Sequence, residues 1–510
     1  MLAIAVSAAV AGIDAHVVRV EADSSAGTPG FSIVGLPDRA LNESRERVRA
    51  AIANSGFCVP PGRLLVNLAP ADTRKEGTAF DLAIALVLLA MDEQIPREQL
   101  ASYVICGELA LDGTLRAVPG VLAMTIAARR AGYGRMVVPE ASREEAALVE
   151  GIDVYAVPSL TGAVAVVLGN GAKYRERGTT VLDDGERASC GDYADVRGQA
   201  VAKRALEIAA AGGHNVVLVG PPGCGKTMLA RRLPSILPAM TVAEALDVTT
   251  VYSVAGLLGA RPRVISARPF RAPHHSASRA SIVGGGSVPR PGEISLALNG
   301  VLYLDELGEF PRSALEVLRQ PLEEGTVTIA RASATTTFPA RFTLVASMNP
   351  CPCGFRGVRG SDCRCDDATV AKYLGKLSGP LLDRIDLHVT VAKVSFGDLT
   401  AKAAPETSAV VRARVEAARA RQAERFEGSE ITTNAAIPAA SVRRWCALDA
   451  EPLALLEGAV TRGTLSARAF DRIARVARTI ADLDAAERIA RPHVAEALLY
   501  RGFERTARAA

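Results

Sequence analysis

The spacing of apolar and polar residues over positions 1–170 predicts a compact domain that mixes strands and helices. Short apolar runs between turn residues are typical of strands, whereas longer runs with a period of about 3.6 residues are typical of helices. The first apolar run lacks a basic leader, so we expect a buried strand at Met1–Val6 rather than a signal peptide. The other predicted strands are Val17–Ala22, Phe31–Leu36, Leu64–Leu68, Tyr103–Gly107 and Arg135–Pro139. The predicted helices are Leu41–Gly56, Asp81–Met91 and Val118–Gly132.

The pattern changes twice further along the chain. Residues 171–191 are polar and charged, which indicates a linker. Residues 192–395 return to short apolar strands separated by helices, and they predict a second α/β domain. Residues 396–510 are rich in Ala and Arg at helical spacing, which predicts a small helical domain.

One strand of the second domain is followed by a glycine-rich loop. The strand is Val216–Val219, and the loop reads Gly220-Pro221-Pro222-Gly223-Cys224-Gly225-Lys226-Thr227. This fits the phosphate-loop pattern, in which glycines let backbone N–H groups face phosphates at the start of a helix. Lys226 would reach the β- and γ-phosphates, and the Thr227 hydroxyl would bind Mg²⁺.

A second apolar strand ends in two carboxylates. Leu302–Leu304 would deliver Asp305 to the metal, and Glu306 lies where a carboxylate could orient or deprotonate the attacking water. Together with the phosphate loop, this strand predicts hydrolysis of ATP or GTP with Mg²⁺.

The 78 residues at positions 227–304 exceed what one βαβ step of about 30 residues needs, which predicts an insertion. Its segment at positions 266–275 and the run Gly284–Gly286 favour a projecting hairpin or loop. After Glu306 we expect a helix at Ser313–Leu322. Strands at Val327–Ala330 and Phe342–Ala346 would flank a loop that carries Arg331.

Three further polar residues lie where they could contact phosphate. Asn349 ends an apolar strand and could reach the γ-phosphate or the water, although it could also form an ordinary Asn-Pro turn. Arg384 could act as an arginine finger, or it could pair within the chain with Asp383 or Asp386. Arg468 follows the N-cap candidate Ser466 and opposes the helix dipole, so it either serves an anion or lies on a solvated face.

Four of the nine cysteines fall within a short stretch, at Cys351, Cys353, Cys363 and Cys365. Four thiols at this spacing could bind Zn²⁺ as a tetrahedron. The C-x-C spacing is tighter than the usual C-x₂-C, so reduced or redox-active thiols remain the alternative. Clustered cysteines favour a reducing compartment over a disulfide framework, and we expect a cytoplasmic protein.

Composition limits the interactions of the chain. Lys and Arg total 59 and Asp and Glu total 55, so the net charge is +4 and any nucleic-acid contact needs a local basic patch. Aromatic residues make up 4%, which gives no sign of a base-stacking platform. No apolar stretch reaches the roughly 18 residues of a membrane span, so we expect no membrane partner.

These segments together resemble the magnesium-chelatase-like AAA+ ATPases of the YifB/ComM type over nearly the whole chain. Besides the phosphate loop and the carboxylate motif, the resemblance lies in Phe31–Pro37, Glu43–Arg49, Lys75–Gly77, Phe80–Leu82, Asp195–Gln199, Ser378–Leu387 and Thr479–Leu483. It implies a Lon-protease/ribosomal-S5-like α+β domain over 1–170, a AAA+ core over 192–395 and a helical lid over 396–510. The core would carry a helix-2 insertion and a Cys-rich insertion at 351–365.

The resemblance also implies roles for single residues. Asn349 would be sensor 1, Arg384 a finger acting in trans, and Arg468 sensor 2. A Lon-like protease needs a serine and a lysine, but Ala79 and Leu122 stand at those positions, with Thr78 one residue away. We therefore expect a proteolytically inactive domain.

The resemblance implies an ATP-driven homo-hexamer that acts on single-stranded and branched DNA, as a branch-migration helicase in recombination during natural transformation. The cations expected in its pore are Arg268, Arg271 and Arg331, unless they are solvated surface residues. The alternatives are a chelatase-like motor and a protein-remodelling ATPase, both without DNA activity.

Overall fold

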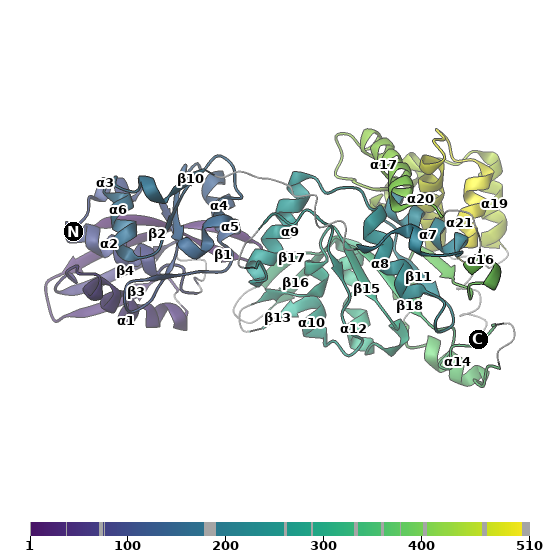
Figure 1. Cartoon of the computed structure of the whole chain (residues 1–510), viewed down its shortest axis with the longest axis horizontal. Coiled ribbons are helices and arrows are strands. Elements are labelled where there is room, and N and C mark those ends of the chain that lie inside the picture. The colour runs from purple at the N-terminus through teal and green to yellow at the C-terminus, as the bar shows by residue number, and fades with distance from the viewer. Residues whose placement is uncertain are drawn as a thin grey trace.

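The structure is a computed structural model that describes most of the chain between Leu2 and Arg501. The described ranges are 2–36, 38–70, 75, 77–177, 190–259, 263–286, 289–330, 335–358, 362–377, 379–400, 405–461 and 467–501. Arg331, Ser466 and the side chain of Arg468 lie outside this description. An N-terminal sheet, a parallel sheet and a group of helices follow one another along the long axis of the molecule (Figure 1).

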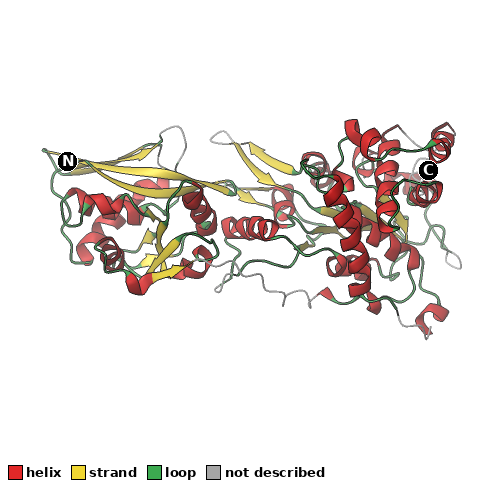
Figure 2. Ribbon diagram, turned by 90° about the horizontal axis from the view of Figure 1, so that it is seen from above, coloured by secondary structure: helices red, strands yellow, loops and turns green. Residues whose placement is uncertain are grey.

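The N-terminal sheet has eight strands in the order β10-β9-β8-β5-β1-β2-β4-β3, with both parallel and antiparallel pairs. A long antiparallel hairpin of β1 and β2 forms its centre and extends toward the rest of the molecule (Figure 2). The strands are β1 (Ala3–Ala11), β2 (Asp14–Ser25), β3 (Gly30–Val34), β4 (Arg63–Ala69), β5 (Val104–Ile105), β8 (Arg135–Pro139), β9 (Asp153–Val157) and β10 (Arg175–Arg177), with β6 (Glu108–Leu109) and β7 (Leu115–Arg116) as a separate hairpin.

Strand β1 is apolar at every position except Ser7 because helices cover both of its faces. Ala3, Ala5 and Ala9 pack in the cluster that contains helix α2, whereas Val6 and Ala8 pack in the cluster that contains α4. Successive side chains of a strand point to opposite faces, so a strand buried on both sides is apolar on both. The buried hydroxyl of Ser7 is hydrogen-bonded with the Cys106 thiol. The N-terminal helices are α1 (Arg39–Asn54), α2 (Asp81–Met91), α3 (Arg97–Leu100), α4 (Val121–Arg130), α5 (Arg143–Ala146) and α6 (Leu160–Val167).

Each predicted element of this region is present close to its expected bounds, and seven further α-helices and strands were not predicted. These are α3, β6, β7, α5, β9, α6 and β10. Strand β10 pairs with β9, so the N-terminal sheet extends to Arg177, into the segment that was expected to be a linker.

The second sheet has five strands in the order β12-β15-β18-β11-β19, and every pair is parallel. The strands are β11 (Val216–Val219), β12 (Phe270–Arg271), β15 (Val301–Leu304), β18 (Thr343–Met348) and β19 (Leu387–Thr390). Because β15, β18 and β11 are neighbours, the loops after their carboxyl ends meet at one edge of the sheet. The predicted mixed α/β organisation with a parallel-sheet core is confirmed.

The insertion differs from the sequence-based expectation. Phe270–Arg271 lies inside the segment expected to project, but it forms the edge strand β12, which pairs with β15. The remainder of the insertion consists of α9 (Val242–Ala255), α10 (Arg279–Val283), the hairpin β13 (Gly284–Gly285) with β14 (Arg290–Pro291), and α11 (Glu293–Leu296).

Two details after Glu306 also differ. The single helix expected at Ser313–Leu322 is two short helices, α12 (Arg312–Glu316) and α13 (Arg319–Glu324). Strand β16 (Thr326–Ala330) is paired antiparallel with a strand that was not predicted, β17 (Thr335–Pro339), before β18 begins. The other helices of this region are α7 (Ala200–Gly212), α8 (Lys226–Ile236), α14 (Asp367–Leu374) and α15 (Gly379–Leu382).

The C-terminal helices share a hydrophobic core with the parallel sheet. Val216 and Leu218 of β11 belong to the same cluster of buried residues as Val415, Ile473 and Ile480. The helices are α16 (Phe396–Thr400), α17 (Ser408–Arg425), α18 (Val442–Trp445), α19 (Ala450–Thr461), α20 (Ala467–Leu483) and α21 (Arg491–Leu499). Within the described ranges, no helix has the length and apolar character needed to cross a membrane.

The N-terminal sheet is packed directly against the insertion. Val10 and Ile13, at the tip of the β1–β2 hairpin, contact the cluster that contains Val248 and Val251 of α9. Ser253 of α9 also donates a hydrogen bond to the Glu145 carboxylate. These contacts join the two sheets into one continuous structure.

Candidate nucleotide site

The phosphate loop joins β11 to α8 and requires glycine at several positions. Gly223 and Gly225 have φ values of 73° and 93°, in the left-handed region that favours glycine. A Cβ atom at Gly220 would lie 2.3 Å from the Val391 carbonyl oxygen, so this position has no room for a side chain. The loop leads into the N-terminus of α8, where backbone N–H groups and the helix dipole favour an anion.

Lys226 folds back into this loop. Its ammonium group donates hydrogen bonds to the Gly220 and Pro221 carbonyl oxygens at 2.7 and 2.9 Å, and to Asn349 Oδ1 at 3.2 Å. Partial burial lowers the pKa of Lys226 below its ordinary value. Lys226 and Asn349, which are far apart in the sequence, therefore meet at the predicted phosphate position.

Thr227 and Asp305 are held together as a pair of oxygen ligands. Thr227 Oγ1 donates to Asp305 Oδ2 at 3.0 Å, and the Tyr303 hydroxyl donates to Thr227 Oγ1 at 3.2 Å. Ser347 donates a further hydrogen bond to Asp305. Burial opposes ionisation of Asp305, but hydrogen bonds from Ser347, Tyr303 and Thr227 outweigh it, so its pKa is lowered. A hydroxyl beside an ionised carboxylate is a donor set that suits Mg²⁺, a cation that prefers oxygen.

Glu306 projects from the same strand end toward solvent. Its φ of 52° lies in the left-handed region, which is uncommon for a residue other than glycine and is often found at functional sites. Its backbone N–H donates to Asp305 Oδ1 at 3.1 Å, and its carboxylate lies 3.4 Å from His275 Nδ1. The carboxylate is thus beside that of Asp305 and remains open to water.

Arg384 lies outside this group of side chains. Its guanidinium group pairs with Glu323 and donates to the Pro380 carbonyl oxygen at 2.6 Å, and its side chain is 11% exposed. The intramolecular partner is thus neither Asp383 nor Asp386. Arg468 lies in the first turn of α20, as expected.

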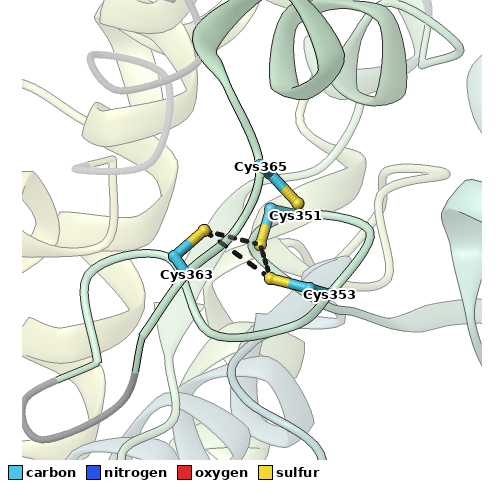
Figure 3. Close-up of side chains that lie close together, drawn as sticks. All are labelled: Cys351, Cys353, Cys363 and Cys365. Atoms are coloured by element: carbon cyan, nitrogen blue, oxygen red, sulfur yellow. Dashed lines mark hydrogen bonds between the residues drawn. The ribbon is translucent and has the colours of Figure 1, made fainter.

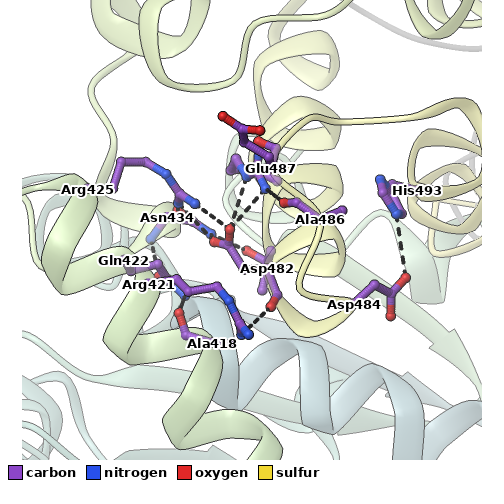
Figure 4. A network of polar contacts seen from close by, with 12 residues as sticks. Ala418, Arg421, Gln422, Arg425, Asn434, Asp482, Asp484, Ala486, Glu487 and His493 are labelled. Carbon is purple, nitrogen blue, oxygen red and sulfur yellow. Dashed lines mark hydrogen bonds and ion pairs between the residues drawn. The ribbon is translucent and has the colours of Figure 1, made fainter.

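Helix α20 is fixed by a network of buried polar groups around Asp482 (Figure 4). The carboxylate of Asp482 is fully buried and binds Arg425 and Arg478. Asn434 donates to Asp482 Oδ2 at 2.8 Å and to Thr479 Oγ1 at 3.0 Å. Buried charges of this kind are tolerated where they are paired and hydrogen-bonded.

The network continues from α20 into the parallel sheet through His214. Its Nε2 atom lies 2.8 Å from Thr479 Oγ1, and its Nδ1 atom lies 3.1 Å from Asp386 Oδ2. The position of α20, and thereby of the backbone of Arg468, is tied to the segment that carries Arg384.

Four residues that contribute to the site were given no role from the sequence. Two of them, Tyr303 and Ser347, hold the Thr227–Asp305 pair. Tyr303 precedes Asp305 by two positions, so the alternation of a strand could have placed both on one face. Gln199 Nε2 donates to the Cys224 carbonyl oxygen at 3.1 Å, and His275 faces Glu306; both contacts arise from long-range packing that leaves no local signal.

Two of the cations expected in a pore are engaged within the chain. Arg268 pairs with Glu244 at 3.2 Å and donates to the Asn299 carbonyl oxygen at 2.6 Å. Arg271 pairs with Glu293 at 2.7 Å. Each of these guanidinium groups therefore has a carboxylate partner within the chain, and their place in a pore stays a prediction.

A five-stranded parallel sheet that brings Lys226, Thr227 and Asp305 to one edge defines a phosphate-loop nucleoside triphosphatase. Three family profiles match the chain in order. They are subunit ChlI of Mg-chelatase over residues 20–142, magnesium chelatase subunit ChlI over 192–399, and magnesium chelatase subunit ChlI C-terminal over 405–501. The chain belongs to the magnesium-chelatase-like family that includes YifB and ComM, and this family implies an ATPase that uses Mg²⁺.

Two relatives align over almost their whole length. The uncharacterised protein YifB of Escherichia coli (strain K12) is 43% identical over 505 residues, covering 99% of this chain and 98% of YifB. Competence protein ComM of Haemophilus influenzae is 44% identical over 510 residues, covering 99% of this chain and 98% of ComM. The magnesium-chelatase 67 kDa subunit of Chlorobaculum parvum is 30% identical over 164 residues, which cover 31% of this chain and 23% of that subunit.

Proposed function

We propose that the protein is a cytoplasmic, ATP-driven homo-hexameric motor that migrates DNA branches during recombination in natural transformation. The observation that carries this proposal is the 44% identity to competence protein ComM over 99% of the chain. The similarity to the magnesium-chelatase 67 kDa subunit covers only 31% of the chain, whereas the similarity to YifB and ComM covers 99% of it. The whole chain therefore resembles YifB and ComM rather than that subunit. Single-stranded and branched DNA are the proposed substrates.

The residues of the nucleotide site have separate parts in the proposed hydrolysis. Lys226 would bind the β- and γ-phosphates, and Thr227 with Asp305 would hold Mg²⁺, which neutralises phosphate charge when bound. Glu306 would orient and deprotonate the attacking water. Asn349, already hydrogen-bonded to Lys226, would contact the γ-phosphate or that water.

Two arginines would complete the site. We propose that Arg384 acts on the nucleotide of a neighbouring subunit and that Arg468 acts as sensor 2 from the first turn of α20. The buried Nε atom of Arg384 has no hydrogen-bond partner in the described part of the chain. Arg268, Arg271 and Arg331 remain the proposed pore cations.

We further propose that the N-terminal domain is Lon-like in fold and has no protease activity. Ala79 and Leu122, at the two expected catalytic positions, are buried apolar residues. The hydroxyl of Thr78 donates a hydrogen bond to the Glu108 carboxylate, which is an acid and not an activating lysine.

The decisive experiment is migration of a three- or four-stranded DNA junction by the purified full-length protein. ATP-dependent migration and stimulation of ATP hydrolysis by DNA are expected for the wild type. Lys226→Ala should abolish nucleotide binding and migration. An intact hexamer that neither processes junctions nor responds to DNA would contradict the proposal.

Glu306→Gln tests the assigned chemistry independently of the DNA substrate. It should retain nucleotide binding and slow hydrolysis by about 10²-fold or more, because the amide cannot accept the proton of the water. Glu309→Gln, three residues away on an exposed turn, is the matched control and should hydrolyse ATP normally. Normal turnover by Glu306→Gln would show that another group activates the water.

The second candidate is a chelatase-like or protein-remodelling ATPase. It is favoured by the three matched family profiles, all of which describe a chelatase subunit. This function predicts ATP hydrolysis that responds to a polypeptide partner and not to DNA.

A further inference from the structure

Cys351, Cys353, Cys363 and Cys365 converge beside the nucleotide site (Figure 3). Their four Sγ atoms all lie within 4.8 Å of one another. The separations are 3.3 Å for Cys351–Cys353, 3.7 Å for Cys351–Cys363 and 3.6 Å for Cys353–Cys363. A disulfide requires about 2.05 Å between sulfur atoms, and all nine cysteines are free thiols.

These separations suit a single tetrahedral ion. Metal–sulfur bonds of about 2.3 Å at tetrahedral angles require sulfur atoms about 3.8 Å apart. A cluster of several iron atoms needs a wider cage, because irons and sulfides must fit between the thiolates. Four sulfur ligands and no open position are typical of a structural zinc site.

The turn between the first two ligands and the third rests on the phosphate loop. Gly354 follows Cys353, and its N–H donates to the Cys351 carbonyl oxygen at 2.9 Å. A Cβ atom at Gly354 would lie 2.6 Å from Pro222 Cδ and 3.7 Å from Asn349 Cγ. Any movement of this turn would therefore alter the surroundings of both the phosphate loop and Asn349.

The segment after the fourth ligand reaches the other side of the site. Helix α14, which carries Tyr373, follows Cys365. The ring of Tyr373 packs so closely on Gly308 that a Cβ atom added to Gly308 would lie 2.7 Å from it. Lys376 donates to the Gly308 carbonyl oxygen at 3.0 Å. Gly308 lies two residues after Glu306, so this contact borders the proposed water-activating carboxylate.

We propose that the four cysteines bind one zinc ion, which clamps residues 351–358 against the phosphate loop on one side and residues 362–376 against the turn after Glu306 on the other. Zinc occupancy thereby sets the affinity of the protein for nucleotide. The inference rests on the ATP-binding part of the proposed function. Its tests require no DNA, so failure of the DNA proposal would leave it intact.

The first test is elemental analysis of the full-length protein, purified without added metal. We expect about one zinc per chain, no iron, and no visible absorbance. Cys363→Ser and Cys365→Ser should each lose the zinc, while the control Cys58→Ser, at an exposed cysteine of the N-terminal domain, should keep it. A wild type with iron, with no metal, or with disulfides among these cysteines would overturn the proposal.

The second test measures coupling to the nucleotide. Titration with a fluorescent ATP analogue should show about tenfold weaker binding after zinc is removed by a chelator, with recovery when zinc is restored. Gly354→Ala should keep its zinc yet bind the analogue more weakly, because its Cβ would clash with Pro222. Unchanged affinity in both the zinc-free protein and Gly354→Ala would overturn the clamp.

Discussion

At the scale of single residues, the proposed magnesium ligands Thr227 and Asp305 are positioned by the hydroxyl groups of Tyr303 and Ser347. Tyr303 and Asp305 point to the same side of β15, and Thr227 approaches them from α8. The ring of Tyr303 is 2% exposed and stacks on Phe270 with ring centres 5.8 Å apart. The ring therefore supports the sheet edge, while the hydroxyl orients Thr227.

Tyr303→Phe should separate these two contributions. The ring and its packing remain, but the hydrogen bond to Thr227 is lost, which costs about 1 kcal/mol. We expect the Mg²⁺ concentration for half-maximal ATP hydrolysis to rise about fivefold, while the midpoint of thermal unfolding falls by only about 2–4 °C. Tyr103→Phe, in the N-terminal domain, is the control, and an equal rise in both variants would refute the role of the Tyr303 hydroxyl.

At the scale of elements, Arg384 links the end of α15 to α13 through Glu323. If Arg384 serves a neighbouring nucleotide, Arg384→Ala should lower turnover by about 10³-fold. Glu323→Gln removes only the intramolecular partner and should remain close to the wild type. Steady-state ATP hydrolysis by the two variants decides the question, since equal losses would mean that the ion pair is the whole role of Arg384.

The contact of His214 with Asp386 and Thr479, which links the parallel sheet to α20, predicts that the stability of the fold depends on pH. Burial opposes ionisation of Asp386, but the hydrogen bond and charge of His214 outweigh it and lower its pKa to about 2. The ordinary value is about 3.9, so the ionised carboxylate stabilises the folded chain fully above about pH 4 and loses this effect as the pH falls toward 2.

The midpoint of thermal unfolding should therefore be lower in Asp386→Asn than in the wild type, and this difference should shrink between about pH 4 and pH 2. At about pH 5 it should be at its full value. Asp449→Asn, at an exposed ion pair, is the control and should change the midpoint little. A difference that grows on acidification would contradict the assignment.

Elements defined by local patterns were predictable, and those defined by pairing were not. Helix α2 has the predicted bounds because it is apolar on every side and flanked by turns. Strand β12 was missed because two residues become a strand only by pairing with β15. The phosphate loop and Asp305 were found from short motifs. The partner of Arg384 was not, because Glu323 is 61 positions away.

At the scale of the whole molecule, Ile13 joins two hydrophobic cores. It packs against the cluster of the parallel sheet and also against the cluster shared by α4 and α9. Ile13→Asp would place a charge between them and should lower the free energy of unfolding by about 1–3 kcal/mol. Leu65→Asp, at an N-terminal position that is 44% exposed, should change it by about 0.5 kcal/mol or less. Denaturant unfolding followed by fluorescence and circular dichroism would measure both, and equal effects would argue against a joining role.

The β1–β2 hairpin has a mechanical consequence. At its tip, a Cβ on Gly12 would lie 3.1 Å from the Thr337 carbonyl oxygen of β17, so the hairpin touches the backbone of its neighbour. The nine residues of β1 span about 30 Å at roughly 3.3 Å each. Pivoting at the tip by about 10° would move the far end by about 5 Å, so the hairpin would act as a lever arm. Small displacements of β17 would be amplified at the opposite end of the molecule.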